Sequence, residues 1–212
     1  MKRFLSLLQH PLTKGLALDD PRTTVLRQQI VREKRFLWKI YREWSCAIRD
    51  NVPAGPGRVL ELGSGGGILS EFIPDVLTSD VMALPQLHLV ASGEALPFDA
   101  ASLKAIVMTN VFHHIPDVRA FLRDSARVTR VGGRMVMIEP WNTAWSRFVY
   151  RGLHHEAFEP AARDWALAAG SGPLSTANGA LPWIVFERDR ARFDAEFPEW
   201  RLASITPLMP LS

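Results

Sequence analysis

The stretch that decides the fold of this chain is Val59-Leu60-Glu61-Leu62-Gly63-Ser64-Gly65-Gly66-Gly67. A short apolar strand with an acid near its end leads into a loop that has four glycines in five residues. Glycine is needed where the backbone turns with positive φ, or where a ligand must contact the main chain without an intervening Cβ. A strand followed by such a loop is where an open α/β sheet binds nucleotide-like ligands. We therefore expect a ligand site at this loop.

The glycine spacing argues against a dinucleotide. The dinucleotide fingerprint is G-x-G-x-x-G, and counting from Gly63 and Gly65 its last position is Ile68. Glu61, two residues before the first glycine, would repel a pyrophosphate and attract a cation. A nicotinamide oxidoreductase is therefore disfavoured, while an ordinary glycine-rich turn without a ligand stays open as an alternative.

The glycine motif resembles the first motif of class I S-adenosylmethionine (SAM)-dependent methyltransferases, whose ligand carries an ammonium group and no phosphate. Further stretches are similar to the type 11 family of small-molecule methyltransferases, namely residues 92–98 (SGEALPF) and 111–117 (VFHHIPD). The Arg-Val-Gly-Gly-Arg turn at residues 130–134 is also similar to the turn before the fifth strand of that family. The resemblance is specific from about Val59 to Glu139.

The alternation of strand and helix patterns over this region predicts parallel βαβ units. The fold class is α/β, with a doubly wound, Rossmann-like, mostly parallel sheet that carries helices on both faces. Strands are expected at residues 59–62, 76–80, 87–91, 105–110 and 134–139, with a helix after Asp117 that Gly132-Gly133 ends. Residues 1–56 are expected as an N-terminal helical lead-in. Residues 57–212 are expected as the SAM-binding domain, with an acceptor-side insertion or lid at 140–188.

The lead-in has a helix start signal at Asp20-Pro21 and an end signal at Asn51-Val52-Pro53, with apolar residues at helical spacing between them. Its basic residues form either a solvated face of a packing helix or a surface that meets an anionic acceptor or a membrane. In class I methyltransferases such a helix commonly covers the cofactor cleft. The basic residues are Arg27, Arg35, Lys39, Arg42 and Arg49.

The resemblance implies a role for each part of the cofactor site. Glu61 would hold the ammonium of SAM, directly or through water, and the loop would lie against the amino-acid and sugar parts. Asp80, at the tip of the second strand, would accept the ribose hydroxyls, although capping the next turn is the alternative. Asn110 would lie beneath the sulfonium. The loop residues are Gly63, Ser64, Gly65 and Gly67.

Adenine recognition departs from the family pattern. Ser92 and Gly93 stand where relatives carry an Asp-Ala pair, so the backbone contact can persist while the carboxylate contact is lost or weakened. Ser92 can still accept a hydrogen bond. Gly93 and Glu94 would border the adenine.

Two adjacent histidines follow the fourth strand. His114 is the first candidate for a general base and His113 the second, because histidine titrates near neutrality. The alternative is that the pair orders its loop. No metal is expected, because adjacent side chains diverge and no third ligand is near in the sequence.

The insertion is the most aromatic part of the chain and follows strand five, which places it at the carboxyl edge of the sheet. Its aromatic residues suit either the wall of an acceptor pocket or the core of a helical subdomain. The substrate-side candidates are Trp141, His154, His155, Glu156 and Asn178.

The C-terminal part predicts a helix at 189–197 and a sixth strand at 200–206, with too few residues after Pro207 for a seventh strand. Truncation, a sheet that stops at six strands, or an edge supplied by a partner would each account for this. An unpaired sixth strand would be an exposed edge, through which a homo-oligomer could form.

Composition sets further bounds. The chain has 212 residues, 47% hydrophobic and 22% charged, with a formal net charge of +3, as in a soluble globular protein. One cysteine, Cys46, excludes an internal disulfide, and no apolar run approaches a membrane span. We expect a cytoplasmic protein without a transmembrane segment. The positive charge leaves nucleic-acid methylation open, but the fourth strand is not followed by an Asn-Pro-Pro-Tyr-like stretch, which argues against methylation of base amino groups. No nucleic-acid partner is therefore expected.

The sequence thus predicts a SAM-dependent methyltransferase that transfers a methyl group to a small-molecule acceptor by in-line displacement and leaves S-adenosylhomocysteine. A non-catalytic SAM-binding or regulatory protein of the same fold is the alternative. Since the methyl group is already activated, the main tasks of the protein would be alignment and desolvation.

Overall fold

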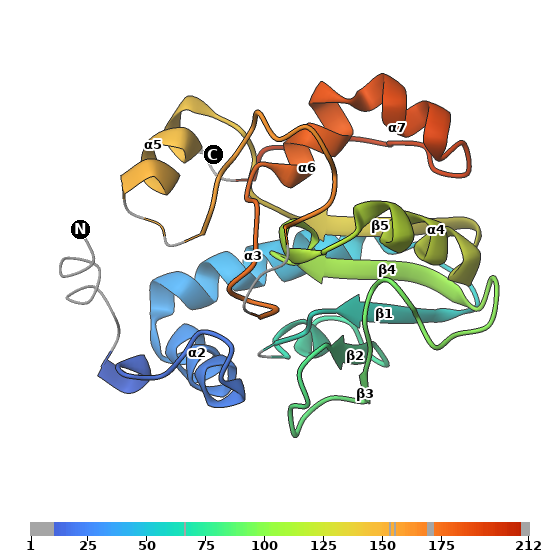
Figure 1. The fold of residues 1–212 in the computed structure, drawn as a ribbon. Coiled ribbons are helices and arrows are strands. Elements are labelled where there is room, and N and C mark those ends of the chain that lie inside the picture. Colours follow the sequence, from blue (N-terminus) through green and yellow to red (C-terminus); the bar gives the residue numbers. More distant parts are fainter. Residues whose placement is uncertain (1–10, 66, 153, 155, 169–171, 209–212) are drawn as a thin grey trace.

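The computed structural model describes residues 11–65, 67–152, 154, 156–168 and 172–208 (Figure 1). Within them, one all-parallel sheet of five strands has the order β3-β2-β1-β4-β5. The direction of winding reverses between β1 and β4, so the predicted doubly wound α/β fold is confirmed. The strands are β1 (Arg58–Leu62), β2 (Leu77–Asp80), β3 (Leu89–Val90), β4 (Leu103–Thr109) and β5 (Thr129–Ile138).

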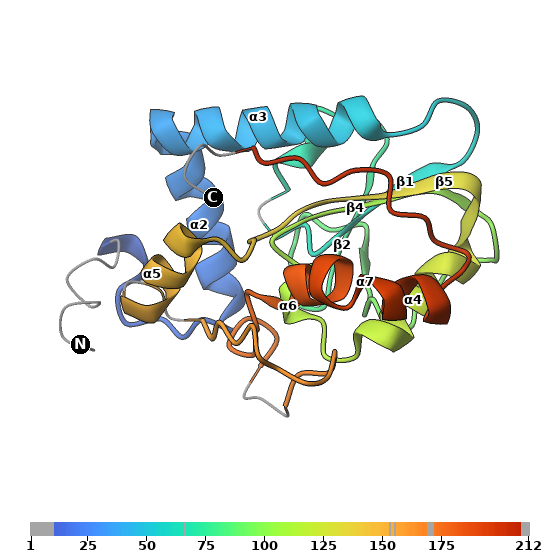
Figure 2. The same cartoon turned by 90° about the horizontal axis from the view of Figure 1, so that it is seen from above.

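Helices surround the sheet. They are η1 (Pro11–Thr13), α2 (Pro21–Glu33), α3 (Arg35–Asn51), η2 (Leu69–Glu71), η3 (Phe112–His114), α4 (Val118–Val128), α5 (Ala144–Gly152), α6 (Leu181–Trp183), η4 (Ile184–Arg188, a π-helix) and α7 (Arg190–Glu196). Figure 2 shows α3 on one side of the sheet and α4, α6 and α7 on the other. Among the described residues, no helix is both long and apolar enough to cross a membrane.

The central strands are apolar throughout because each of their faces packs on a different cluster. Leu60 and Ile106 face the larger cluster, which includes Phe121 of α4 and residues of α6, η4 and α7. Val107, on the opposite face of β4, packs in a second cluster with Ile48 of α3. The alternation of side chains along each strand thus places helices on both sides.

The N-terminal lead-in forms two helices rather than the single predicted one. Asp20 caps α2 as expected and accepts a hydrogen bond from the backbone N–H of Arg22 at 2.9 Å. Lys34 is extended, with φ −89° and ψ 101°, and breaks the helical run. The break lets α3 pack on the sheet through Ile48 while α2 extends over the ends of the strands. Sequence periodicity continues through Lys34, so it could not reveal the change of direction.

Two local predictions between β4 and β5 have different outcomes. Asp117 caps α4, as expected, by accepting from the backbone N–H groups of Arg119 and Ala120. Gly132-Gly133, however, does not end this helix, which stops at Val128 before β5 begins. Gly132 has a φ of 76° and lies in a register irregularity where β5 starts to pair with β4. The glycine pair therefore makes a bulge in the strand.

The C-terminal part confirms a helix but not a sixth strand. Helix α7 lies within the predicted range 189–197, whereas residues 200–206 have no strand pairing. The Trp200 indole N–H donates to the carbonyl of Leu122 in α4 at 3.1 Å, and Leu202 packs against the larger cluster. These side chains bind the segment to the helical layer, so it adds no strand. Association through a sheet edge stays a prediction, and it would now involve β5 or β3.

Candidate functional site

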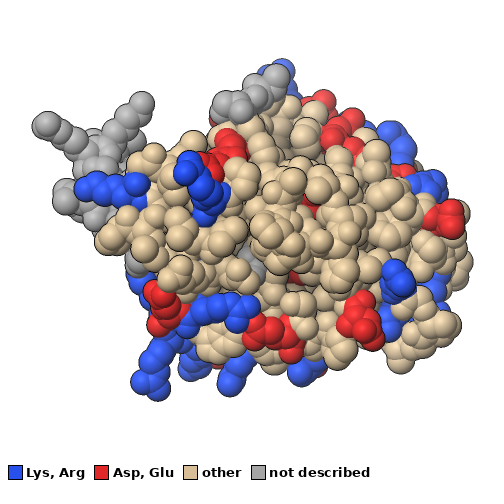
Figure 3. All heavy atoms as spheres, turned by 90° about the horizontal axis from the view of Figure 1, so that it is seen from below, with Lys and Arg blue, Asp and Glu red and all other residues tan. Residues whose placement is uncertain are grey.

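A cavity of about 540 Å³ lies at the carboxyl ends of β1, β2 and β4. Every residue predicted for the cofactor lines it: Glu61, Gly63, Ser64, Gly65, Gly67, Asp80, Ser92, Gly93, Glu94 and Asn110. Figure 3 shows the molecule from below, with Lys and Arg gathered mainly toward the periphery and a broad uncharged surface between them. The cavity lies where the winding of the sheet reverses, which is the usual ligand position in such folds.

The glycine loop is shaped by close backbone contacts. Gly63 has a φ of 65°, and a Cβ there would lie 2.5 Å from Cγ2 of Val111, so no larger residue fits. The backbone N–H of Gly65 donates to Oδ2 of Asp80 at 3.1 Å. The Ser64 hydroxyl accepts from the backbone N–H of Ser79 at 3.0 Å, which ties the loop to β2.

Asp80 performs the capping role that was the alternative to ribose binding. Its Oδ1 accepts from the backbone N–H of Met82 at 3.0 Å, and its Oδ2 accepts from Gly65. These two bonds orient the carboxylate at the cavity wall. Each carboxylate oxygen has a second lone pair, so both can still accept from a diol.

Glu61 is buried, with 5% of its surface exposed, and its Oε2 has no hydrogen-bond partner among the described residues. Burial, opposed by a hydrogen bond from Ser64 and assisted by the charge of Asp80, raises the pKa of this carboxyl to about 8. A buried carboxylate oxygen without a partner is costly unless a cation or donor meets it. The ammonium of an amino acid is such a group.

The turn that would border adenine is built by its own side chains. The Ser92 hydroxyl accepts from the backbone N–H of Glu94 at 3.3 Å, and Oε1 of Glu94 accepts from the backbone N–H of Asp117 at 2.9 Å. A Cβ on Gly93 would lie 2.9 Å from Leu62 and 3.0 Å from Phe121. Gly93 is therefore required by the core beneath the turn.

At the end of β4, Asn110 lines the cavity and has a φ of 56°. Asparagine tolerates this left-handed conformation better than most residues. The backbone N–H of Asn110 donates to the carbonyl of Ile138 at 2.8 Å, which anchors it to β5.

The two histidines have different environments. His114 lines the cavity, and its Nδ1 donates to the carbonyl of Thr176 at 2.9 Å. His113 is buried and is not among the residues that line the cavity. Its Nδ1 donates to Oε2 of Glu139 at 2.6 Å, and its Nε2 lies 3.4 Å from Oε2 of Glu156. His113 therefore joins η3 to the end of β5 through Glu139 and does not face the cavity.

Neighbouring charged groups shift the pKa values of His113 and Glu156. Burial would lower the pKa of His113, but Glu139 and Glu156 outweigh it and raise the pKa to about 9. Burial likewise tends to raise the pKa of Glu156, yet the neighbouring imidazoles of His113 and His114 hold it well below its ordinary value. Oε1 of Glu139 also accepts from the backbone N–H groups of Val111 and Phe112, at 2.7 and 2.8 Å.

The substrate-side candidates that the structure describes lie outside the cavity wall. Trp141 donates to Glu187 at 3.2 Å and packs against the larger cluster. Oδ1 of Asn178 accepts from the backbone N–H groups of Glu159 and Ala180, so this side chain fastens the insertion. His154 and Glu156 lie beside the two histidines. His155 lies outside the described residues.

Residues other than the substrate-side candidates close the cavity. Helices α2 and α3 contribute Thr24, Arg27, Gln28, Val31, Tyr41 and Ser45, and the insertion contributes Pro173 and Leu174. The backbone N–H of Leu174 donates to Oδ1 of Asp19 at 2.7 Å, which joins the insertion to the lead-in. A covering helix was expected at this position, but no sequence signal identified the individual side chains.

Comparison with known proteins shows which proteins this chain is similar to. A family model described as a methyltransferase domain matches residues 60–137. An uncharacterized methyltransferase of Mycobacterium tuberculosis is 34% identical over 106 residues, which cover 43% of this chain and 42% of that protein. This chain therefore spans about two fifths of the length of the first curated relatives it matches.

Two further relatives have more specific names. A ubiquinone biosynthesis O-methyltransferase of Xanthomonas axonopodis is 27% identical over 179 residues, which cover 68% of this chain and 72% of that protein. A demethylmenaquinone methyltransferase of Renibacterium salmoninarum is 29% identical over 135 residues, which cover 53% of this chain and 56% of that protein.

Proposed function

We propose that this chain is a SAM-dependent methyltransferase with a small-molecule acceptor, since a family model described as a methyltransferase domain matches its residues 60–137. The observation that carries the proposal is the buried Glu61, whose Oε2 has no partner among the described residues, in the wall of a ligand-sized cavity. An enzyme that binds SAM needs an anionic contact for its ammonium, and this carboxylate supplies one.

The rest of the cavity suits the other parts of SAM. Asp80 presents two oxygens to the ribose hydroxyls from the tip of β2. The glycine loop between them lets the ligand contact the main chain. Gly93 and Glu94 border the adenine side, and Asn110 lies at the end of β4 where the reacting groups would meet.

Bound SAM supplies a methyl group that its sulfonium already activates, so the protein needs no nucleophile. The described residues would align the acceptor and exclude water, with α2, Tyr41 of α3 and the 173–174 segment covering the cavity. If the acceptor must lose a proton, His114 is the candidate base, since it lines the cavity and His113 does not. Its Nδ1–H is held by Thr176, which leaves Nε2 as the proton-accepting atom.

The acceptor class is proposed from the relatives. Two relatives are named for ubiquinone biosynthesis and for demethylmenaquinone, and the cavity here has walls of both polar and apolar residues. Small hydroxylated aromatic compounds of the quinol type are therefore the first acceptors to test. Transfer would be followed with SAM labelled in its methyl group.

Calorimetric titration tests the cofactor. We expect SAM and S-adenosylhomocysteine to bind and NAD not to bind. Glu61→Gln should weaken SAM binding about 10- to 100-fold, because hydrogen bonds to charged groups contribute about 1.5–3 kcal/mol. Glu43→Gln, at an exposed glutamate of α3, is the matched control and should change nothing.

A ligand without the amino-acid part of SAM shows which part of the ligand each substitution affects. Methylthioadenosine lacks the amino-acid part of SAM, so Glu61→Gln should leave its affinity unchanged while Asp80→Asn weakens it. Failure of the folded protein to bind either SAM or its demethylated product would overturn the assignment. Binding without transfer to any acceptor would instead favour a non-catalytic SAM-binding protein.

A further inference from the structure

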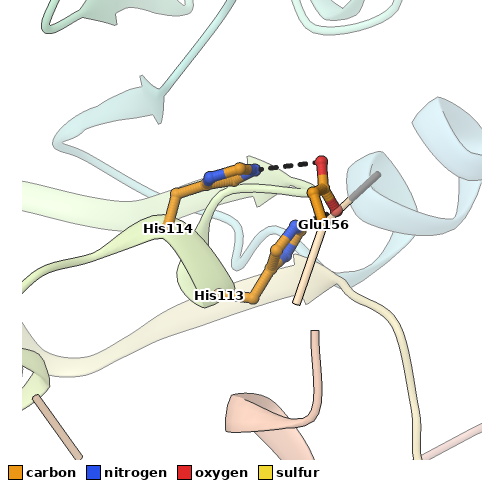
Figure 4. A group of neighbouring side chains, drawn as sticks. All are labelled: His113, His114 and Glu156. Carbon is orange, nitrogen blue, oxygen red and sulfur yellow. Dashed lines mark ion pairs between the residues drawn. The ribbon is translucent and has the colours of Figure 1, made fainter. Parts of the chain in front are cut away.

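A cluster of three side chains lies beside the cavity and is not explained by SAM binding. His113 and His114 come from η3, and Glu156 comes from the insertion after α5 (Figure 4). Figure 4 shows both imidazole rings directed toward the Glu156 carboxylate. One ligand atom from each residue can be chosen so that all three lie within 4.8 Å of one another. The two rings do not diverge, since their centroids are 4.3 Å apart. Both reasons for expecting no metal here are therefore removed.

The distances in the cluster suit metal coordination better than hydrogen bonding. Nε2 of His113 lies 3.4 Å from Oε2 of Glu156, and Nε2 of His114 lies 3.6 Å from Oε1. Hydrogen bonds between nitrogen and oxygen are usually 2.7–3.2 Å long. A tetrahedral ion with bonds of about 2.0–2.1 Å separates its ligand atoms by about 3.3–3.4 Å. The two imidazoles face different oxygens of the same carboxylate, so the three side chains would close from within 4.8 Å of one another onto one ion.

The outer contacts of both histidines follow the pattern of metal ligands. A metal-bound imidazole almost always donates its other N–H to a carboxylate or a carbonyl, which orients the ring. Nδ1 of His113 donates to Glu139, and Nδ1 of His114 donates to the carbonyl of Thr176. Glu139 is itself held by two backbone N–H groups at the start of η3. In both histidines Nε2 is therefore the nitrogen that faces the Glu156 carboxylate.

Charge and burial also favour a cation. The side chains of His113 and Glu139 are 2% and 3% exposed, and that of Glu156 is 14% exposed. Two carboxylates thus face two imidazoles in a poorly solvated place. A divalent ion would compensate both carboxylates while the imidazoles remain neutral, the form in which they bind metals.

We propose that His113, His114 and Glu156 form a binding site for a divalent transition-metal ion, with zinc the best fit. Two imidazole nitrogens and one carboxylate oxygen are a recurrent ligand set for zinc with an open fourth position. The site lies against the part of the cavity wall that His114 forms. It would also join η3, which follows β4, to the insertion, because its ligands come from both.

The proposal is independent of SAM binding, but it bears on the reaction. Nε2 of His114 cannot hold a metal and accept a proton at the same time. A metal-loaded enzyme would lower the pKa of an acceptor hydroxyl by coordinating its oxygen. The metal therefore offers a second route to acceptor activation at the same wall of the cavity.

The test measures zinc binding to the full chain, expressed without a polyhistidine tag and stripped with a chelator. Competition with a chromogenic chelator should show one zinc ion bound per chain. His114→Gln and Glu156→Gln should each weaken zinc binding by more than about 100-fold, and Glu139→Gln by about 10- to 100-fold through the orientation of His113. His88→Gln and Glu187→Gln are the matched controls, since both residues lie away from the cluster.

Circular dichroism and SAM titration on every variant separate loss of a ligand from loss of the fold. Variants that keep their helical signal and SAM affinity but lose zinc support the site. Absence of zinc binding by the folded wild-type chain would overturn the proposal. So would zinc binding that the His114→Gln/Glu156→Gln double variant retains.

Discussion

The glycine-loop side of the cavity and the insertion side are built in different ways. On the glycine-loop side, Glu61, Asp80 and the loop between them lie on neighbouring strands and are held by short-range turns. On the insertion side, Glu156, Thr176 and Asn178 meet residues of η3 that are distant in the sequence. The first arrangement follows from a local motif. The second depends on contacts between distant segments, which form only when the whole chain folds.

The largest expected effect on the free energy of unfolding comes from Glu139, whose side chain lies where the two sides meet. Glu139→Ala removes a buried carboxylate that accepts from His113, Val111 and Phe112. Removing one partner of a buried ionic network costs about 3–5 kcal/mol, so we expect that loss in the free energy of unfolding. Urea denaturation measures it. The exposed Glu187→Ala, which loses one hydrogen bond from Trp141, should cost about 1 kcal/mol. Equal losses in the two variants would contradict the buried-network account.

Two separate substitutions, one at Gly63 and one at Gly132, test the packing on the glycine-loop side. Gly63→Ala combines left-handed strain of about 1–2 kcal/mol with overpacking of about 1–3 kcal/mol against Val111. Gly132→Ala has a similar φ of 76° but open space around its Cβ, so only the strain should appear. Denaturation midpoints compare the two. Val111→Ala should partly rescue Gly63→Ala, and no rescue would mean that the predicted overlap is not the cause.

Asn178 tests the insertion side. Asn178→Ala leaves the backbone N–H groups of Glu159 and Ala180 without their acceptor, which should cost about 1–3 kcal/mol. Limited proteolysis should then cut the insertion faster while SAM affinity stays close to wild type, because Asn178 does not line the cavity. Asn51→Ala, at an exposed asparagine, is the control. A large loss of SAM affinity in Asn178→Ala would show that the two sides are coupled.

A pH dependence of SAM binding is also expected on the loop side. With a pKa of about 8, Glu61 is protonated at neutral pH in the empty cavity, and the SAM ammonium favours its ionised form. SAM affinity should therefore rise with pH, by at most about tenfold per unit, and level off above about 8. Titrations from pH 6 to 9 measure this slope. Glu61→Gln should remove it, and a slope that persists in that variant would assign the proton to another group.

Sequence reasoning succeeded where the relevant interactions are local. The parallel sheet follows from the alternation of elements, and the cofactor residues all line one cavity because βα turns gather at the carboxyl edge of a parallel sheet. It failed at residues 200–206, where β-like composition was outweighed by the packing of Trp200 on α4. It also failed at Lys34, because helical periodicity carries no information about a change of direction.

By itself, the sequence determined the α/β fold, the glycine loop and the positions of Glu61 and Asp80, since spacing along one strand and one turn specifies them. Only the tertiary structure decided which residues cover the cavity, that His114 lines it and His113 does not, and that Glu156 faces both histidines. The physical reason is that these contacts join segments far apart in the chain. Their geometry depends on how the insertion packs, and no local propensity encodes that packing.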